Sequence, residues 1–157
     1  MADAAVAIRP ATTDDARVIW EWRNDQVSRA FSSTVRPVPW EEHEAWFTDA
    51  LRDPERRVLV ATADGQAVGM IRFDAAGEPG TWRVSINLAP EVRGRGLARP
   101  ALDAATAWLV GESGHDVTVV ADVRRDNLAS LRTFQAAGFA PAATSEGWVE
   151  LRQRAGP

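Results

Sequence analysis

The chain has 157 residues with 22 acidic and 18 basic side chains, a formal charge of −4 and a hydrophobic content of 45%, as is typical of one soluble globular domain spanning 1–157. It contains no Cys and only two His, which excludes disulfides and thiolate zinc sites, and we expect no metal site. The acidic balance argues against nucleic acid as the main partner, because phosphate backbones are bound by a concentrated basic face.

The N-terminal third is predicted to form one strand and two helices. Residues 4–9 have the pattern of a short strand. Thr12 then offers an N-cap in front of two acids, and apolar side chains recur at helical spacing as far as Asn24. Two prolines mark 31–39 as a loop, and the second of them can open a helix over 40–51.

Three strands are predicted in the middle of the chain. The segments 57–63 and 67–73 are rich in apolar and β-branched residues, and Asp64-Gly65 between them is a strong two-residue turn signal. These two strands should therefore form an antiparallel hairpin. A loop with Gly and Pro leads to the third strand, 82–88.

The C-terminal half is predicted to alternate helices and strands. A helix over 96–110 is followed by a short buried strand over 117–121 and a second helix over 127–137. The tail has the pattern of a hairpin that turns at Glu146-Gly147. The predicted order of the whole chain is βααβββαβαββ.

The junction between strand 82–88 and helix 96–110 carries the clearest chemical signal. Its turn holds Gly94 and Gly96, which let the backbone approach a ligand closely. The N–H groups of the turn and of the first helical turn point outward, and three arginines add positive charge. These are Arg93, Arg95 and Arg99. The pattern predicts a pyrophosphate site, but a chain without Lys is not a P-loop NTPase.

Two short motifs carry the most specific signal in the chain. One is Arg93-x-x-Gly96-x-Ala98, and the other is Asn127-x-x-Ser130, followed by Phe134 and Gly138-Phe139. The first resembles the (Gln/Arg)-x-x-Gly-x-(Gly/Ala) motif of the GCN5-related N-acetyltransferase (GNAT) superfamily, and the second resembles the second signature of that superfamily. The resemblance covers the whole chain. It implies an α/β (α+β) GNAT fold, with a mixed central sheet of six to seven strands and a splayed acetyl-CoA cleft.

The resemblance also assigns cofactor-binding residues. The pyrophosphate of the cosubstrate acetyl-CoA would bind to the backbone N–H groups of Arg93, Gly94, Arg95, Gly96, Leu97 and Ala98. The backbone of Asn87 and Leu88 would pair with the pantetheine amides, as an added strand does. Asn127, with Ser130 in the same signature, would bond the pantetheine arm, cap its helix, or do both. Phe134 would lie near the thioester sulfur.

The N-terminal half has a further set of segments: Arg9-Pro10, Asp14 or Asp15, Trp22-Arg23-Asn24-Asp25 with Arg29, and His43-x-x-Trp46-Phe47. This set resembles one branch of the superfamily, the pseudaminic-acid-pathway enzymes that acetylate a UDP-linked 4-amino sugar. The branch implies an acceptor site of Arg23, Asn24, Arg29, Phe31, Trp40, His43 and Trp46. Arginines would meet phosphates there, and aromatic rings would stack on a base or sugar. The alternatives are core packing for the aromatic residues and an ion pair within its own helix for Arg23.

Acetyl transfer needs a neutral amine, positioning against the thioester and donors for the oxyanion. The oxyanion donor would be a backbone N–H of 85–88. Many relatives have a Tyr, interpreted as the general acid, where this chain has Phe134. A thiol with a pKa near ~8.5 leaves tolerably as the thiolate, so that acid can be dispensable. Ser85, Asn87 and a water chain are left in place of a third-strand base. His43, a side chain with an ordinary pKa near ~6.5, is a base or substrate anchor unless it is structural.

Two other functions stay open at this point. Similar Trp-Arg-Asn segments occur in ribosomal-protein and microcin-immunity acetyltransferases, so the acceptor is alternatively a protein N-terminal α-amine or an aminoacyl-nucleotide antibiotic. The missing Tyr, and Arg83 in place of the family's third-strand acid, also allow a weakly catalytic acyl-CoA-binding module.

The sequence also gives expectations for the cellular location and the oligomeric state of the protein. No apolar stretch approaches the ~18 residues of a membrane span, so we expect no membrane partner. The N-terminus lacks the basic and apolar regions of a signal peptide, which favours a cytoplasmic location. The expected partner is a small-molecule amine, and the expected assembly is a monomer or homodimer.

Overall fold

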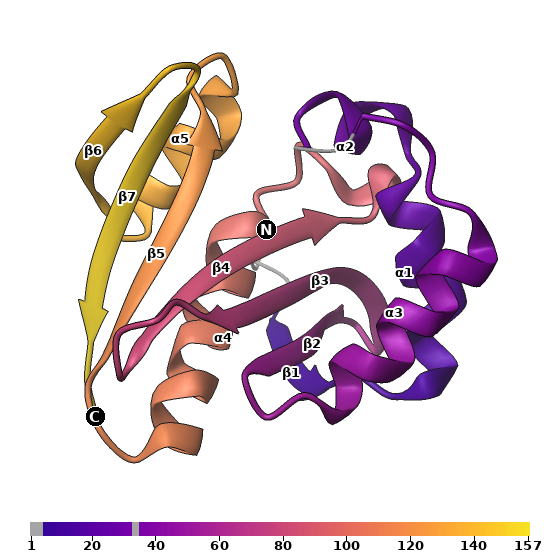
Figure 1. Cartoon of the computed structure of the whole chain (residues 1–157), viewed down its shortest axis with the longest axis horizontal. Helices are drawn as coiled ribbons and strands as arrows, with labels where there is room; N and C mark the ends of the chain where they lie inside the picture. Colours follow the sequence, from indigo (N-terminus) through magenta and orange to yellow (C-terminus); the bar gives the residue numbers. More distant parts are fainter. Residues whose placement is uncertain (1–4, 33–34) are drawn as a thin grey trace.

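The structure is a computed structural model that describes residues 5–32 and 35–157. Within these residues seven strands form one sheet in the order β1-β2-β3-β4-β5-β7-β6 (Figure 1). Neighbouring strands are antiparallel except β4 and β5, which are parallel. The expected mixed sheet is confirmed. The first residue of predicted strand 4–9 and part of predicted loop 31–39 lie outside the described residues.

The N-terminal third holds one more helix than predicted. Its elements are β1 (Val6–Pro10), the 3-10 turn η1 (Thr13–Asp15), α1 (Ala16–Arg23), α2 (Gln26–Ala30) and α3 (Trp40–Arg52). The additional helix is α2, which has five residues and buries none of them, so no apolar periodicity marks it. Its one local signal is Asp25, whose side chain accepts hydrogen bonds from the N–H groups of Val27 and Ser28.

The middle of the chain forms the predicted antiparallel strands. They are β2 (Arg56–Ala63), β3 (Gln66–Ala75) and β4 (Thr81–Leu88). Asp64 and Gly65 have positive φ angles of 51° and 75°. Two successive residues with positive φ match the right-handed twist of a hairpin, so the predicted turn is confirmed.

The C-terminal half also follows the predicted order. Its elements are the 3-10 turn η2 (Pro90–Val92), α4 (Ala98–Ser113), β5 (Val117–Arg124), α5 (Leu128–Ala136), β6 (Ala140–Ser145) and β7 (Trp148–Ala155). β5 runs past the predicted end at Ala121. The apolar run stops there, but alternation continues, with Asp122 exposed and Val123 buried.

The core lies on both faces of the sheet. α4 crosses one face and contacts β1 to β5, whereas α1 and α3 pack together on the other, over β2 and β4 (Figure 1). The predicted apolar stripe of α4 is fully buried at Ala101, Leu102, Ala105 and Leu109. Helices on both faces therefore hold the central strands in place.

The sheet opens between β4 and β5. These strands pair only at Thr81–Arg83 with Thr118–Val120. Beyond that point β4 stays paired with β3 as far as Leu88, and β5 stays paired with β7 as far as Arg124. The two strands diverge toward the carboxyl end of β4 (Figure 1), so this end of the sheet has a splayed gap.

Candidate active site

The edge of β4 presents unpaired backbone groups to the splayed gap. The N–H of Ala89 donates to the carbonyl of Val68 in β3, and on the other side the N–H of Thr118 in β5 donates to the carbonyl of Gly80. Because backbone groups alternate along a strand, even-numbered residues of β4 face β5 and odd-numbered residues face β3. Ile86 and Leu88 therefore offer the gap their N–H groups.

This alternation changes one expected contact. The backbone of Asn87 faces β3, where the residue lies opposite Met70. Its side chain is engaged as well, because Asn87 Oδ1 accepts a hydrogen bond of 2.9 Å from Ser28 Oγ. The geometry therefore favours Ile86, in place of Asn87, as the neighbour of Leu88 at the gap.

The turn before α4 has both engaged and open backbone donors. The N–H groups of Arg93 and Arg95 donate to the carbonyls of Pro90 and Val92, so the expected role of these two as pyrophosphate donors is not favoured. Gly94 and Gly96 have φ angles of 78° and 73°, and a Cβ at either would meet no atom within 4 Å. α4 begins at Ala98 without a side-chain cap or an acid in its first turn. Its first N–H groups therefore have no partner inside the helix, and the dipole favours an anion there. Leu97 is buried and packs this turn onto the core.

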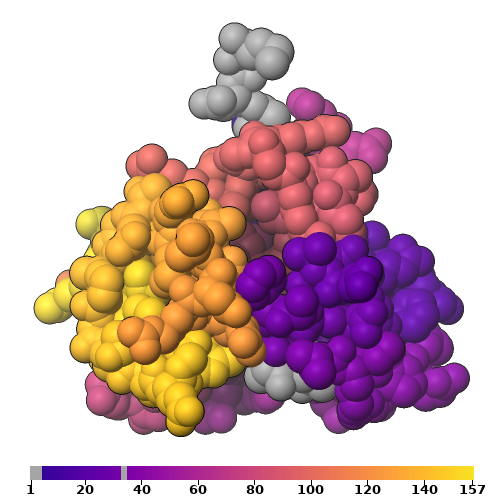
Figure 2. All heavy atoms as spheres, turned by 90° about the horizontal axis from the view of Figure 1, so that it is seen from above, coloured from indigo at the N-terminus to yellow at the C-terminus, as the bar shows by residue number. Residues whose placement is uncertain are grey.

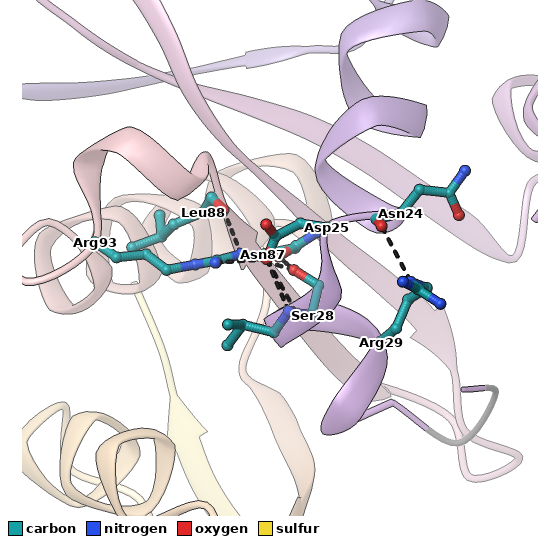
Figure 3. Close-up of polar contacts among 8 residues, drawn as sticks. Asn24, Asp25, Ser28, Arg29, Asn87, Leu88 and Arg93 are labelled. Atoms are coloured by element: carbon teal, nitrogen blue, oxygen red, sulfur yellow. Dashed lines mark hydrogen bonds and ion pairs between the residues drawn. The ribbon is translucent and has the colours of Figure 1, made fainter. Parts of the chain in front are cut away.

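Arg93 does not point its guanidinium away into solvent but toward α2 (Figure 3). Its Nη1 lies 2.6 Å from Asp25 Oδ2, and its Nη2 donates to Ser28 Oγ at 2.7 Å and to the Leu88 carbonyl at 3.4 Å. The hydrogen bond from Arg93 lowers the pKa of Asp25. Together with Asn87 these residues join α2, the end of β4 and the glycine turn.

On the other side of the gap, α5 carries the second signature. Asn127 caps the helix, since its Oδ1 accepts from the N–H of Ser130 at 3.2 Å. Its Nδ2 makes no hydrogen bond within the described part of the chain. Phe134 is buried and lies edge to face with Phe139, at 5.1 Å between ring centroids. Asn127 thus caps its helix and keeps a donor for a ligand.

Three arginines, Arg23, Arg56 and Arg72, have their guanidinium groups over the ring of Trp46 of α3. Arg23 of α1 and Arg72 of β3 lie 5.7 Å and 5.3 Å from the centre of the Trp46 ring. Arg72 lies directly opposite Ser85 on β4, so the two side chains share one face of the sheet. We call Arg23, Trp46 and Arg72 the arginine cluster.

Arg23 has an unbalanced charge. Arg72 is paired with Asp74 at 2.8 Å, but no acidic side chain in residues 5–32 and 35–157 forms an ion pair with Arg23. Burial, followed by the charge of Arg72, lowers the pKa of Arg23. Glu42 opposes this shift, but it is itself paired with Arg36. Because the half-buried guanidinium of Arg23 has no ion-pair partner in the described part of the chain, it would attract the anionic group of a bound ligand.

Other residues predicted for the acceptor hold the loop around α2. The side-chain amide of Asn24 bonds both the N–H and the carbonyl of Val38, at 2.8 and 2.9 Å. Arg29 donates to the carbonyls of Asn24 and Val35. Phe31 at the end of α2 is 38% exposed. Phe31 is therefore free to meet a ligand, whereas Asn24 and Arg29 shape the loop.

Trp40 packs inside the helical layer. Its ring lies edge to face with Trp20 at 5.5 Å, and the Arg17 guanidinium lies 4.0 Å from its centre. Trp46 is also flanked by cations, including Arg56. The rings of Trp40 and Trp46 thus already have partners, and the geometry favours the packing alternative for both.

His43 lies in the hydrophobic core. It is 1% exposed, its Nε2 lies 2.9 Å from the carbonyl oxygen of Ala16, and its ring stacks on Phe47. Burial lowers its pKa, and its Nδ1 is buried without a partner. Because a carbonyl only accepts, Nε2 carries the proton of the neutral ring. This burial argues against the expected role as base or substrate anchor and favours the structural alternative.

Three residues of this region escaped the sequence analysis as site residues: Asp25, Ser28 and Arg72. Arg72 is a charged residue inside an apolar strand, a pattern that could have singled it out. The contacts of Asp25 and Ser28 with Arg93 span 68 and 65 positions of sequence. No local pattern predicts such contacts.

The surface over the site is hollowed. Figure 2 shows a narrow crevice between the C-terminal part of the chain, in orange and yellow, and the N-terminal helices, in indigo, with the segment around residues 90–100, in salmon, beside its upper end. No group of three potential metal ligands occurs in the described ranges. No helix there is long and apolar enough to cross a bilayer.

Comparison with known proteins agrees with this geometry. A family model described as "Acetyltransferase (GNAT) domain" matches residues 6–140. The search of curated proteins gives no match.

Solved structures share the fold at low sequence identity. Spermidine N-acetyltransferase from Vibrio cholerae, solved with CoA and spermine, superposes with a TM-score of 0.81 at 16% identity, over 96% of this chain and 95% of that one. Aminoglycoside acetyltransferase AAC(6')-Ib, solved with coenzyme A, gives 0.80 at 19% over 94% of each chain. The putative acetyltransferase yncA from Salmonella typhimurium, with acetyl-CoA, gives 0.76 at 24% over 96% and 94%.

Proposed function

Because the chain belongs to the acetyltransferase (GNAT) family, a family of acetyl-CoA-dependent N-acetyltransferases, we propose that it acetylates the primary amine of a small molecule that also carries an anion. A nucleotide-linked amino sugar is the acceptor we put forward, with the pseudaminic-acid-pathway enzymes as the related branch. We place the enzyme in the cytoplasm, as one domain acting as a monomer or homodimer.

The arginine cluster supports an anionic acceptor. Arg23 is half-buried, has no acidic partner in the described chain and lies beside Arg72. A charge-assisted bond from a partly desolvated guanidinium to a phosphate is stronger than one in open water. The diphosphate of a nucleotide sugar has this charge, and the exposed Phe31 ring is a surface for its base or sugar.

The residues around the gap fit acetyl-CoA. The glycine turn and the uncapped start of α4 provide N–H donors for its pyrophosphate. Ile86 and Leu88 offer backbone groups along the gap, and Asn127 offers its Nδ2. When bound, acetyl-CoA supplies the thioester whose acyl carbon the amine attacks.

The chemistry of this chain is then mainly positioning. N–H groups at the end of β4 lie on the edge where an oxyanion would be stabilised. Phe134 carries no proton to give, so the departing thiolate, with a thiol pKa near ~8.5, takes its proton from the new ammonium or from water. Ser85 lies on the same strand and is the protein hydroxyl closest in sequence to Ile86.

Other acceptors fit the arginine cluster less well. Two of the similar enzymes are named for their acceptors, spermidine and aminoglycosides. These acceptors are polycations, which the positive charges of Arg23 and Arg72 would repel. An aminoacyl-nucleotide antibiotic shares the phosphate and stays the second candidate. A protein α-amine and a weakly catalytic acyl-CoA-binding module are the remaining alternatives.

Turnover of an amine panel tests the proposal. We expect acetyl-CoA-dependent acetylation of a UDP-linked 4-amino sugar in preference to spermidine and kanamycin. Arg23→Gln should lower kcat/KM for the UDP-sugar about 10- to 100-fold, the worth of one hydrogen bond to a charged group. Arg52→Gln, a matched change at an exposed position of α3, should leave kcat/KM unchanged. Preference for spermidine, or equal effects of the two variants, would refute the anionic acceptor.

A further inference from the structure

The helix α2 has no apolar anchor. None of its five residues is buried, so hydrophobic burial contributes little to its position. What fixes it is polar: Asp25 caps it, and Arg93 binds both Asp25 and Ser28 (Figure 3). A short helix held in this way moves when its polar contacts are lost.

The contact to α2 comes from the cofactor-binding turn. Arg93 is the first residue of that turn, and its guanidinium reaches α2 while its backbone leads directly into Gly94. Ser28 in turn donates to Asn87 at the end of β4. The turn, the gap-lining strand and α2 thus form one hydrogen-bonded unit, which joins residues 59 to 68 positions apart.

We infer that Arg93 is a positioning residue that couples acetyl-CoA binding to the acceptor side of the site. A pyrophosphate bound by the N–H groups of the turn fixes the backbone around Gly94. This holds the Arg93 guanidinium against Asp25 and Ser28, and α2 with the adjoining Phe31 is held in its place. The inference rests on the proposed function for the turn as the pyrophosphate site.

The coupling is reciprocal. If acetyl-CoA raises the affinity of the acceptor, the acceptor raises the affinity of acetyl-CoA by the same factor. Arg93 then acts on the acceptor without touching it. Its pairing with Asp25 also keeps its charge away from the cofactor, so the backbone of the turn, not this side chain, contacts the pyrophosphate.

Hydrogen exchange of α2 with and without CoA tests the coupling without any acceptor. In the wild-type protein, CoA should slow amide exchange across residues 26–32 at least about fivefold, a typical coupling factor. Asp25→Asn keeps an oxygen that can cap α2 but removes the charge that pairs with Arg93. This variant should still bind CoA, and CoA should no longer slow exchange in α2. Asp49→Asn, an exposed carboxylate of α3, is the matched control and should behave as wild type.

The second measurement separates KM from kcat. With the acceptor found by the amine panel, Asp25→Asn should raise the acceptor KM at least about fivefold and change kcat by a smaller factor. Ser28→Ala should do the same to a smaller extent, because it removes the two bonds of the Ser28 hydroxyl but leaves the ion pair between Arg93 and Asp25.

The outcomes distinguish the two proposals. If calorimetry shows that the wild-type protein does not bind CoA, the proposed function fails and this inference with it. If CoA binds but leaves exchange in residues 26–32 unchanged, or Asp25→Asn keeps the protection, only the coupling is wrong. Faster exchange with CoA would also overturn it, because the phosphate would then have taken Arg93 from Asp25.

Discussion

Gly69 of β3 sets how closely β4 approaches its neighbour, next to the splayed gap. Gly69 lies opposite Leu88. A Cβ added at Gly69 would lie 2.8 Å from Leu88 Cδ2 and 3.1 Å from the backbone oxygen of Asn87. The Leu88 side chain can rotate away, but the Asn87 carbonyl is backbone and moves only with the strand. Gly69→Ala should therefore displace the end of β4.

The cost can be estimated from this overlap. Overpacking a well-packed site costs about 1–3 kcal/mol, and about 1 kcal/mol shifts Tm by roughly 2–4 °C in a chain of this size. We therefore expect Tm to fall by roughly 2–12 °C. One misaligned hydrogen bond at Leu88, worth about 1 kcal/mol, should also weaken acetyl-CoA binding about fivefold.

Thermal denaturation and calorimetric titration with acetyl-CoA measure the two effects on the same samples. Gly111→Ala is the control, because a Cβ there, in the last turn of α4, meets nothing within 4 Å. It should raise Tm slightly, since Ala favours helix over Gly. A Gly69→Ala protein with wild-type Tm and wild-type acetyl-CoA affinity would refute the claim that this glycine positions β4.

Three further predictions concern single side chains. Burial lowers the pKa of His43, so on acidification this side chain is protonated in the unfolded state before it is protonated in the folded state. The contribution of neutral His43 to the free energy of unfolding is therefore present above about pH 6.5, and it is lost as the pH falls below that value. His43→Phe should therefore flatten the fall of Tm between about pH 7 and pH 5, and an unchanged slope would contradict this. Asn127→Asp keeps the capping oxygen and loses the Nδ2 donor, so Tm should hold while acetyl-CoA binds several-fold more weakly; Asn127→Ala should lose about 0.5–2 kcal/mol of stability as well. Phe134→Tyr should raise kcat if proton delivery to the thiolate limits the rate, and no gain at any pH would show that it does not.

Short-range sequence patterns were sufficient to predict most of the helices and strands. The turn at Asp64-Gly65 and the apolar stripe of α4 were both predictable from spacing alone. α2 was not, because a one-turn helix without buried residues has no periodicity. The end of β5 was missed because half-buried alternation replaces an apolar run after Ala121.

Sequence patterns indicate the parts of the candidate site that depend on local backbone geometry, but they do not indicate contacts between side chains that are distant in sequence. Gly94 and Gly96 indicate a close backbone approach whatever surrounds them. The burial of His43 depends on Ala16, 27 positions away, and the direction of Arg93 depends on Asp25. The choice between the two faces of β4 at Asn87 and Leu88 requires the register, which no single-strand pattern contains.

The three-residue parallel pairing of β4 and β5 has a consequence for how the chain folds. On one side of it, β1 to β4 are joined by antiparallel neighbours, and on the other, β5 to β7 form a second antiparallel unit. Contacts inside β2, β3 and β4 close short loops and form quickly, whereas the parallel seam closes a long one. We expect the seam to form last and to open first. A ligand that forms hydrogen bonds with both β4 and β5 in the gap would take the place of a strand between them, and it would slow unfolding at that seam.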